Sequence, residues 1–530
     1  MPIRSVQTVP ELFIRAAGLD CHIVADDGRC AVADLEARSR SLAAGLRSLG
    51  VGHGDRVAAW LPNIPDYLTL YVAIARLGAI LVAVNTRFGA AEIADIIGRS
   101  GAKALAVAAE VRGVDQMPVL RQIEAAALPE LRHVIFCGTE GNAKSPWPGT
   151  AAIGLGELAT AAPMDAFAGR PDDLVNIFTT SGTTSAPKFA AHRQRGVVGH
   201  NEDIAKALDF GASGTVSLQL LPFCGVFGFC QVMSALAGGS EIVMPGAIDV
   251  GEAVSLLHRH RATHLFTTDD LLHRMLETAD GGAPFAELRY CMFGGFNTWL
   301  HDLPARAEAR GVPMIAPFGM SEVFAIFAGR RLGDSIDDRH RAGGQLVNPQ
   351  SRVRARDPET GVLLAHGEAG ELEVWGPHMF AEYFGDAEAT RRAMTEDGYL
   401  RTGDLGYSET DTRFTYLQRM NDTLRLGGFL VAPAEIETAV MAHPAVKDAQ
   451  VVAIGTSAGN RPVAFVIPSS AEEFDEAGVI AACGAHLPKF KTPVRVISLP
   501  EFPVTRSANG TKIQRAKLRQ MAQKAVSTSS

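Results

Sequence analysis

The stretch DRVAAWLPNIPDYLTLYVAIARLGAILVAVN, which covers Asp55–Asn85, decides the fold class of this chain. Its opening run, DRVAAWLP, is short and apolar and predicts a β-strand. The part from Tyr67 to Val84 then predicts a buried helix, a break at Gly78 and a second strand, and Arg76 argues against a membrane span. A strand, a helix and a strand in succession are typical of a layered α/β fold with mostly parallel sheets.

The same alternation continues along the chain. Short apolar runs that end in Gly, Pro or Thr recur at Glu241–Pro245, Ala262–Thr268, Leu288–Gly295 and Val312–Gly319. In open α/β sheets, ligands bind beyond the carboxyl ends of the strands. We therefore expect the chemistry of this protein to collect where these runs end.

Length and composition limit the classes of protein to which this chain can belong. With 530 residues, the chain exceeds what one hydrophobic core usually supports, so two or more domains are expected. A net charge of −8 argues against a nucleic-acid partner. The seven cysteines contain no CxxC pair, which is typical of reduced thiols in a cytoplasmic enzyme. The N-terminus also lacks the apolar core of a signal peptide.

The hydrophobic periodicity and the composition of the sequence change in its last third. From about Gln345 the residues alternate with a period near two around turns, which predicts a small antiparallel β unit. A compact α+β pattern follows, and six lysines lie from Lys447 onward. This shift predicts a separate C-terminal domain with a boundary near Arg419–Asp422, and the last ten residues, 521–530, are expected to be a flexible tail.

One loop carries a pattern suited to an anion. TTSGTTSAPK, at Thr179–Lys188, follows an apolar strand with hydroxyl residues, a glycine and a lysine. Backbone N–H groups, hydroxyls and a lysine in such a turn can hold phosphate oxygens. The Walker spacing is absent, and composition alone favours a solvated Ser/Thr linker over a phosphate loop.

Four more motifs strengthen the phosphate interpretation. They lie at Pro317–Glu322, Gly370–Pro377, Tyr399–Tyr407 and Ser507–Arg519. With the loop at Thr179–Lys188, they resemble the adenylate-forming (AMP-binding) superfamily, which includes acyl-CoA synthetases, nonribosomal-peptide adenylation domains and luciferases. The resemblance to the acyl-CoA synthetase/ligase branch covers nearly the whole chain, with the motifs in family order.

The resemblance implies a two-step reaction. A carboxylate first attacks the α-phosphate of ATP to give an acyl-adenylate and pyrophosphate, with Mg²⁺ beside the phosphates. A thiol, normally that of coenzyme A, then attacks the mixed anhydride. The implied domains are an adenylation domain over residues 1–419, a hinge at 420–422 and a small mobile domain over 423–520, which closes for the first step and rotates for the second.

The resemblance also assigns roles to individual residues. Lys512 is implied to bind the attacking carboxylate and the α-phosphate, where it would stabilise charge that grows in the transition state. Glu322 and Thr183 are the implied metal-binding residues, although Glu322 could also be an acid at a helix start. Asp404 is implied to accept the ribose hydroxyls, and Arg419 to contact ribose or phosphate.

The remaining implied positions concern the nucleotide, the hinge and coenzyme A. The nucleotide-binding set is Thr180, Ser181, Gly182, Thr183, Thr184, Lys188, Gly294, Gly295, Phe318, Gly319, Met320, Ser321, Asp404 and Arg419. Within that set Phe318 stands where the family often stacks an aromatic on adenine; its alternative is a core position. Asn421 falls at the hinge, where many relatives carry Asp or Lys, and Gly427 and Gly428 match the coenzyme A channel.

The predicted acyl pocket consists of Gly225, Phe227, Phe296, Met320 and Phe324. Gly225 stands where many relatives carry a histidine, which frees space. The aromatic side chains favour a short, alicyclic or aromatic acid over a long chain, unless they pack away from the substrate. No acid lies in Leu221–Phe229 to bind an amine, which disfavours a peptide-synthetase module.

Two alternatives remain open beside an acyl-CoA ligase. One is an acyl-adenylate ligase that loads a carrier protein, and the other is a nucleotide-binding pseudoenzyme. The departures at Ser185, Phe189 and Asn421 motivate the pseudoenzyme, and the first two predict a stiffer phosphate loop. The expected partners are a small carboxylic acid, ATP and coenzyme A, with a homodimer as the candidate assembly and no nucleic acid or membrane span.

Overall fold

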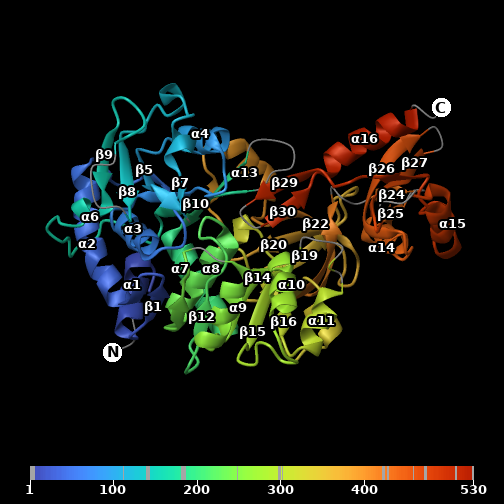
Figure 1. Cartoon of the computed structure of the whole chain (residues 1–530), viewed down its shortest axis with the longest axis horizontal. Helices are drawn as coiled ribbons and strands as arrows, with labels where there is room; N and C mark the ends of the chain where they lie inside the picture. The colour runs from blue at the N-terminus through green and yellow to red at the C-terminus, as the bar shows by residue number, and fades with distance from the viewer. Residues whose placement is uncertain are drawn as a thin grey trace.

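A computed structural model describes residues 6–527 except for short gaps. The gaps are 112, 139–143, 181–186, 247–248, 296–299, 301, 421–423, 427–428, 432, 457–458, 471–473 and 508–509. Figure 1 shows an elongated molecule in which α14, α15, β26 and β27 gather at one end, and α1 and β1 lie at the other. No helix within the described ranges is both long and apolar enough to cross a membrane.

The unit that decides the fold has the predicted form. β3 (Arg56–Trp60) and β4 (Ile80–Ala83) pair in parallel, with Val57 opposite Leu81, and α3 (Pro65–Arg76) connects them. α3 begins at a proline, which is pre-set for the first helical turn. Gly78 has φ +67° and lies against the His53 ring, so glycine is needed at this break.

β3 and β4 belong to an eight-stranded sheet within the described residues. Its order is β21 (Glu382–Tyr383), β11 (Phe189–Arg193), β10 (Leu174–Thr179), β4, β3, β5 (Ala104–Ala108), β8 (His133–Cys137) and β9 (Ala151–Gly154). The strands from β10 to β9 are parallel, and β11 and β21 are added antiparallel at the edge. The phosphate loop connects β10 to β11, so it lies at the carboxyl end of a parallel strand, as predicted.

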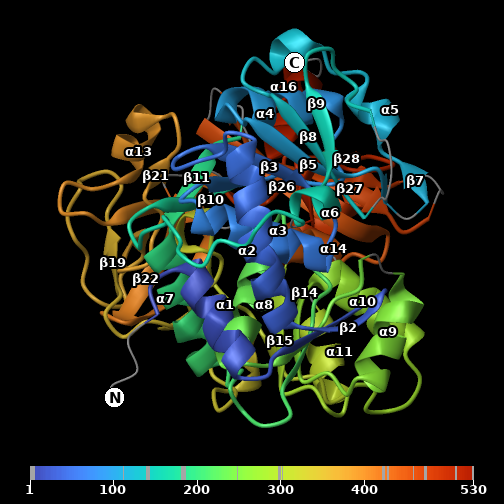
Figure 2. The ribbon, with the colours of Figure 1, turned by 90° about the vertical axis from the view of Figure 1, so that its left-hand side faces the viewer.

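A second layer repeats this architecture. Its order is β16 (Met314–Ile315), β15 (Tyr290–Gly294), β14 (His264–Thr268), β12 (Val216–Leu218), β13 (Glu241–Val243), β1 (His22–Ala25) and β2 (Gly28–Ala31), and only the β1–β2 pair is antiparallel in the part described. One hydrophobic core draws residues from both sheets and from the helices of the N-terminal region. The main helices there are α1 (Val9–Gly18), α2 (Val32–Ser48), α4 (Ala90–Ser100), α7 (Gln194–Ala207), α8 (Val226–Gly238), α9 (Val250–Arg259), α10 (Asp269–Thr278) and α11 (Leu303–Ala309). Figure 2 shows α1, α3, α7 and α8 gathered in the middle of the N-terminal region.

The predicted antiparallel β unit is also present. It contains β17 (Ala328–Gly329), β18 (Gly343–Leu346), β23 (Arg413–Arg419), β22 (Leu400–Thr410), β20 (Gly370–Trp375) and β19 (Arg352–Arg356), in that spatial order. Every pair recorded in this sheet is antiparallel. The period-two pattern of the sequence is therefore confirmed here.

The C-terminal part has hydrophobic cores of its own. It contains α14 (Pro433–Met441), β26 (Val446–Thr456), β27 (Gly459–Pro468), α15 (Glu476–His486), β28 (Arg495–Ser498) and α16 (Arg515–Ser527), with hairpins β24–β25 (Leu424–Leu426, Phe429–Val431) and β29–β30 (Val504–Ser507, Gly510–Ile513). The tail expected to be flexible from residue 521 is instead helical as far as Ser527. Leu518 and Ala522, one helical turn apart, are both buried in the core beside Phe465, which holds α16 against the sheet.

Candidate functional site around Glu322

Glu322 lies on a tight turn that few sequences could form. A β-carbon added at Gly319 would lie 1.1 Å from the carbonyl oxygen of Ala325, so only glycine fits there. Ser321–Val323 form a single 3₁₀ turn, and Phe324 and Ala325 follow with φ of 55° and 77°. Two successive non-glycine residues in the left-handed region are strained, and strain of this kind concentrates at functional sites.

Two buried histidines support this turn. The imidazole Nε2 of His192 on β11 lies 2.8 Å from the carbonyl oxygen of Ser321. The rings of His192 and His200 pack edge-on against the Phe324 ring at 5.0 and 5.8 Å. Burial lowers the pKa of His192 to about 4 and that of His200 to about 3. Both are therefore neutral at pH 7, and His192 donates Nε2–H to the carbonyl oxygen.

The Glu322 carboxylate is held by a tyrosine that sequence reasoning missed. The hydroxyl of Tyr383 on β21 donates to Oε1 of Glu322 at 2.5 Å. The backbone oxygen of Glu322 also accepts from the amide of Phe380 at 2.7 Å. Burial and the Glu322 carboxylate raise the pKa of the Tyr383 phenol, so it remains a donor. No motif signalled Tyr383; only the pairing of β21 with β11 brings it to this place.

The two described ends of the phosphate loop close on each other. The amide of Thr180 donates to the Lys188 carbonyl oxygen at 2.8 Å, and the Lys188 amide donates to the Thr180 hydroxyl at 3.3 Å. The Lys188 ammonium lies 4.6 Å from the centre of the Tyr383 ring, a cation–π distance. The structure therefore joins this end of the loop to Glu322 through Tyr383. Ser181, Gly182, Thr183, Thr184 and Ser185 lie outside the described residues.

Phe189, which departs from the family pattern, has a structural explanation. Its side chain is buried in the core on one face of the eight-stranded sheet. The Arg99 guanidinium lies 4.2 Å from the centre of its ring and donates to the carbonyl oxygen of Pro187 at 2.9 Å. Phe189 therefore anchors the outgoing end of the loop to α4.

A second cluster joins the predicted ribose residues. Asp404 and Arg419 lie opposite each other on β22 and β23, and Arg419 Nε lies 3.0 Å from Oδ1 of Asp404. Arg419 also donates to the Thr402 carbonyl oxygen at 3.0 Å. Asp404 is buried, whereas the Arg419 side chain is 48% exposed. The pair therefore brings together the carboxylate that is predicted to bind ribose and the guanidinium that is predicted to contact ribose or phosphate.

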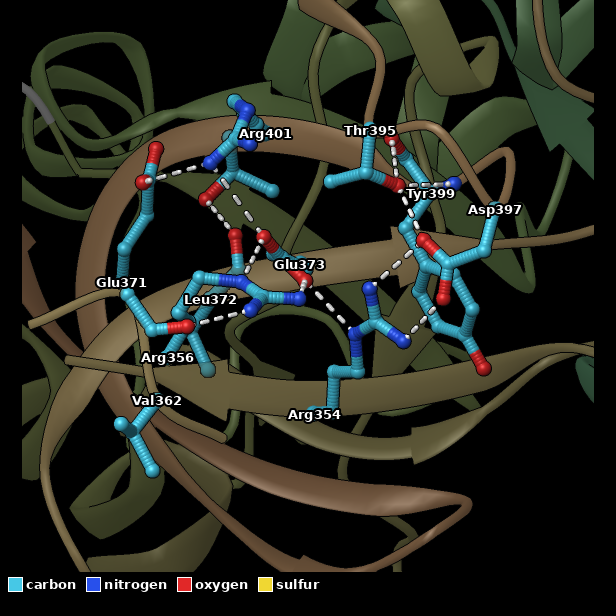
Figure 3. A network of polar contacts seen from close by, with 12 residues as sticks. Arg354, Arg356, Val362, Glu371, Leu372, Glu373, Thr395, Asp397, Tyr399 and Arg401 are labelled. Carbon is cyan, nitrogen blue, oxygen red and sulfur yellow. Dashed lines mark hydrogen bonds and ion pairs between the residues drawn. The ribbon is translucent and has the colours of Figure 1, made fainter. Parts of the chain in front are cut away.

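A polar network fixes the strand that carries Asp404 (Figure 3). Glu373 on β20 has a fully buried side chain and bonds Arg354 at 2.6 Å and Arg356 at 2.7 Å. Arg354 also donates two hydrogen bonds to the Asp397 carboxylate, at 2.6 and 2.9 Å. The guanidinium of Arg401 lies 3.5 Å from the Glu373 carboxylate. Burial opposes ionisation of Glu373, but its bonds to Arg356 and Arg354 outweigh this and lower its pKa. The network ties β19 and β20 to the loop that enters β22.

The side chain of Phe318 is packed in the hydrophobic core of the β unit. Its ring is 5% exposed and packs edge-on against Phe414 at 4.9 Å and obliquely against Tyr416 at 5.7 Å. Its backbone bridges to Ala328. The ring belongs to the core of the β unit, and its contact with an adenine base stays a prediction.

The predicted acyl pocket is assembled only in part. Gly225 is buried and is the N-cap residue of α8, and the half-buried Phe227 stacks on Phe266 at 5.0 Å. Phe324 is fully buried and contacts Phe178 and Phe229, so it is a core residue and not an open wall, which corrects the prediction. Met320 is half-buried beside the core of the β unit, and Phe296 lies outside the described residues.

The structure describes some of the remaining predicted site residues and leaves others outside the described residues. Gly294 ends β15 opposite Thr268, and Gly295 follows it in an exposed position, so both lie at the carboxyl ends of strands. Lys512 lies on β30 opposite Thr505, but its side chain is not described. Asn421, Gly427 and Gly428 fall outside the described residues, so the hinge and channel remain predictions.

Comparison with known proteins identifies the family. Residues 17–384 match the AMP-binding enzyme family, and residues 435–509 match the AMP-binding enzyme C-terminal domain. The chain therefore belongs to the AMP-binding enzyme family. The predicted membership of the adenylate-forming superfamily is confirmed, as is the enzyme class, an AMP-forming acyl-CoA synthetase.

Three relatives illustrate the match. A protein of Mycobacterium tuberculosis named 3-[(3aS,4S,7aS)-7a-methyl-1,5-dioxo-octahydro-1H-inden-4-yl]propanoyl:CoA ligase is 29% identical over 98% of this chain and 100% of its own. Pyochelin synthase PchD of Pseudomonas aeruginosa is 30% identical over 91% of this chain and 86% of its own. ATP-bound MatB from Rhodopseudomonas palustris has a TM-score of 0.81 at 25% identity, covering 97% of this chain and 98% of MatB.

Proposed function

We propose that this chain activates a carboxylic acid with MgATP and transfers the acyl group to coenzyme A. The observation that carries the proposal is the connected set Lys188, Tyr383 and Glu322, together with the Asp404–Arg419 pair. The set offers a cation for phosphate oxygens, a carboxylate for a metal and a carboxylate for ribose. Arg419 also acts electrostatically on Tyr383, which links the two clusters.

The Glu322 site suits magnesium that arrives with ATP. Mg²⁺ is usually bound by one or two carboxylates together with substrate phosphates and water, not by an all-protein cage. In agreement with this, no cluster of three or more metal-ligating side chains occurs where the structure describes the chain. Glu322 is half-buried, and Tyr383 bonds one of its oxygens, Oε1. Bound there, Mg²⁺ would neutralise the negative charge of the phosphates.

A short, alicyclic or aromatic acid is the favoured substrate. Phe227, stacked on Phe266, and the lack of a side chain at Gly225 support a compact apolar acid. The relative in Mycobacterium tuberculosis, whose name specifies a ring-bearing propanoyl group, is in keeping with this choice. Because Phe324 is buried, fewer aromatic side chains support the proposal than the sequence predicted.

The acceptor in the second step defines a second candidate function. Pyochelin synthase PchD, which is 30% identical, is not named as a coenzyme A ligase, so a carrier-protein thiol is the alternative acceptor. For either acceptor we propose the domain division predicted above, with residues 420–422 as the hinge.

A panel of carboxylic acids tests the proposal. ATP–pyrophosphate exchange, measured acid by acid, reports the first step, and the mass of a coenzyme A thioester reports the second. Exchange with ring-bearing acids and a thioester product are expected. Exchange without a thioester would favour a carrier protein, and no exchange with any acid would exclude catalysis of adenylation.

A further inference from the structure

We infer that Tyr383 is a positioning residue that holds the metal-binding carboxylate of Glu322 and the phosphate-loop lysine Lys188 apart while keeping both in the site. This inference rests on the proposed use of Glu322 and Lys188 toward MgATP. It assigns two separable tasks to one side chain. The hydroxyl orients Glu322, and the ring supports the ammonium of Lys188.

The backbone places Tyr383 accurately with respect to both groups. β21 pairs antiparallel with β11, with Tyr383 opposite Ala190, directly after the phosphate loop. Hydrogen bonds flank this pair: Ala381 donates to the Ala191 carbonyl oxygen at 2.7 Å, and Phe384 donates to that of Phe189 at 2.8 Å. The distance from Tyr383 to the loop is therefore fixed by sheet geometry and not by a flexible side-chain contact.

The hydroxyl of Tyr383 orients the carboxylate of Glu322. It donates to Oε1 at 2.5 Å from a residue that is 5% exposed. A short hydrogen bond to an ionised carboxylate is among the stronger polar contacts. Outer partners of this kind orient metal-binding carboxylates, and their removal usually weakens metal binding by about 10-fold to 100-fold.

The ring of Tyr383 keeps opposite charges from pairing. The Lys188 ammonium lies over the ring at 4.6 Å, and among the described residues Lys188 has no ion pair with a carboxylate. An ammonium and a carboxylate in direct contact would satisfy each other and be less available to MgATP. Because the ammonium contacts the face of the ring while Glu322 bonds the hydroxyl at its edge, Lys188 remains available for phosphate and Glu322 for the metal.

Two substitutions separate the two tasks. Tyr383→Phe removes the hydroxyl but keeps the ring, and Tyr383→Leu removes both. Tyr290→Phe is the matched control because its hydroxyl also donates to a carboxylate, that of Asp209 at 2.8 Å, in the other parallel sheet. Tyr383→Phe in a Glu322→Gln background tests whether the hydroxyl acts through Glu322.

Binding experiments without any acid substrate test the inference. Electron paramagnetic resonance measures the dissociation constant of Mn²⁺ in the presence of α,β-methylene-ATP, and calorimetry measures binding of that nucleotide in EDTA. We expect Tyr383→Phe to raise the Mn²⁺ dissociation constant about tenfold, with metal-free nucleotide binding unchanged. We expect Tyr383→Leu to weaken both, and Tyr290→Phe to weaken neither.

The following results would contradict the role inferred for Tyr383. An unchanged Mn²⁺ dissociation constant in Tyr383→Phe, or an equal increase in the Glu322→Gln background, would overturn the role of the hydroxyl. Metal-free nucleotide binding that is the same in Tyr383→Leu as in Tyr383→Phe would overturn the role of the ring. Failure of the acid panel with normal nucleotide binding would refute the proposed ligase and leave the inference intact.

Discussion

Arg419 lies directly opposite Asp404 on the β22–β23 ladder, with its Nε 3.0 Å from Oδ1 in an ion pair, so the carboxylate predicted to bind ribose is already paired with a cation. Asp404 is buried while Arg419 is half exposed. The guanidinium of Arg419 is therefore open to solvent and to a phosphate, whereas the Asp404 carboxylate is enclosed. The pairing places a cation beside the carboxylate before a nucleotide supplies hydroxyl donors.

Asp404→Asn tests this role. The amide keeps the shape of the side chain but loses the charge, which leaves Arg419 without its carboxylate and weakens the acceptor for ribose. We expect the KM for ATP in pyrophosphate exchange to rise about tenfold or more, because a hydrogen bond to a charged group is lost. Asp411→Asn is the control, since Asp411 lies in the exposed turn between the same two strands. An equal KM in both variants would contradict the assignment.

Asp397→Asn tests the network behind Asp404. Bonds from Arg354 and Thr395 lower the pKa of Asp397, so the folded state holds the charged form more strongly than the unfolded state does. The stabilisation by Asp397 is therefore full above its ordinary pKa of 3.8 and is lost as the pH falls below that value. Urea unfolding at several pH values should show the wild type more stable at pH 7, with the difference shrinking below pH 3.8. A pH-independent difference would contradict this explanation.

The layered architecture was predictable because it depends on patterns spread over many residues. Asp55–Asn85 forms the expected strand, helix and strand, and the period-two stretch after Gln345 forms the antiparallel unit. Apolar periodicity reports which side of an element is buried, and this information is local. The fold class therefore follows from the sequence.

The site was predictable only where a motif marks it. Glu322, Asp404 and Lys188 were proposed from motifs, and in the structure Lys188 and Glu322 both contact Tyr383, one at the ring and one at the hydroxyl. Tyr383 and His192 were missed because their roles arise from pairing between segments far apart in the chain. Phe324 was misassigned to an open pocket because sequence proximity to Glu322 does not reveal that its φ of 55° accompanies a fully buried ring.

His192→Gln tests the support of the Glu322 turn. Burial lowers the pKa of His192 from 6.5 to about 4, so between these values the unfolded chain binds a proton that the folded protein does not. His192 therefore makes the wild type less stable as the pH falls from 6.5 to 4. Glutamine can donate to the Ser321 carbonyl oxygen without titrating. We expect the urea midpoint of the variant to fall less steeply over this range; parallel pH profiles would contradict a buried neutral imidazole.

Lys512→Ala tests the role of the C-terminal part. The family resemblance assigns Lys512 to the first step alone, where a cation beside the α-phosphate stabilises the developing charge. We expect pyrophosphate exchange to be abolished, while thioester formation from supplied acyl-adenylate is largely retained. Lys524→Ala, on helix α16, serves as the control lysine. Loss of both steps would contradict the assigned role.

Gly319→Ala tests whether the tight turn at Glu322 is required. An alanine β-carbon would lie 1.1 Å from the Ala325 carbonyl oxygen, so the turn cannot keep its form. We expect the free energy of unfolding to fall by about 3 kcal/mol, a value typical of severe backbone conflicts. Pyrophosphate exchange should also be lost, since Glu322 is displaced from Tyr383. Gly333→Ala is the matched control, because nothing lies within 4 Å of a β-carbon there. Full activity in Gly319→Ala would show that the position of Glu322 does not depend on this turn.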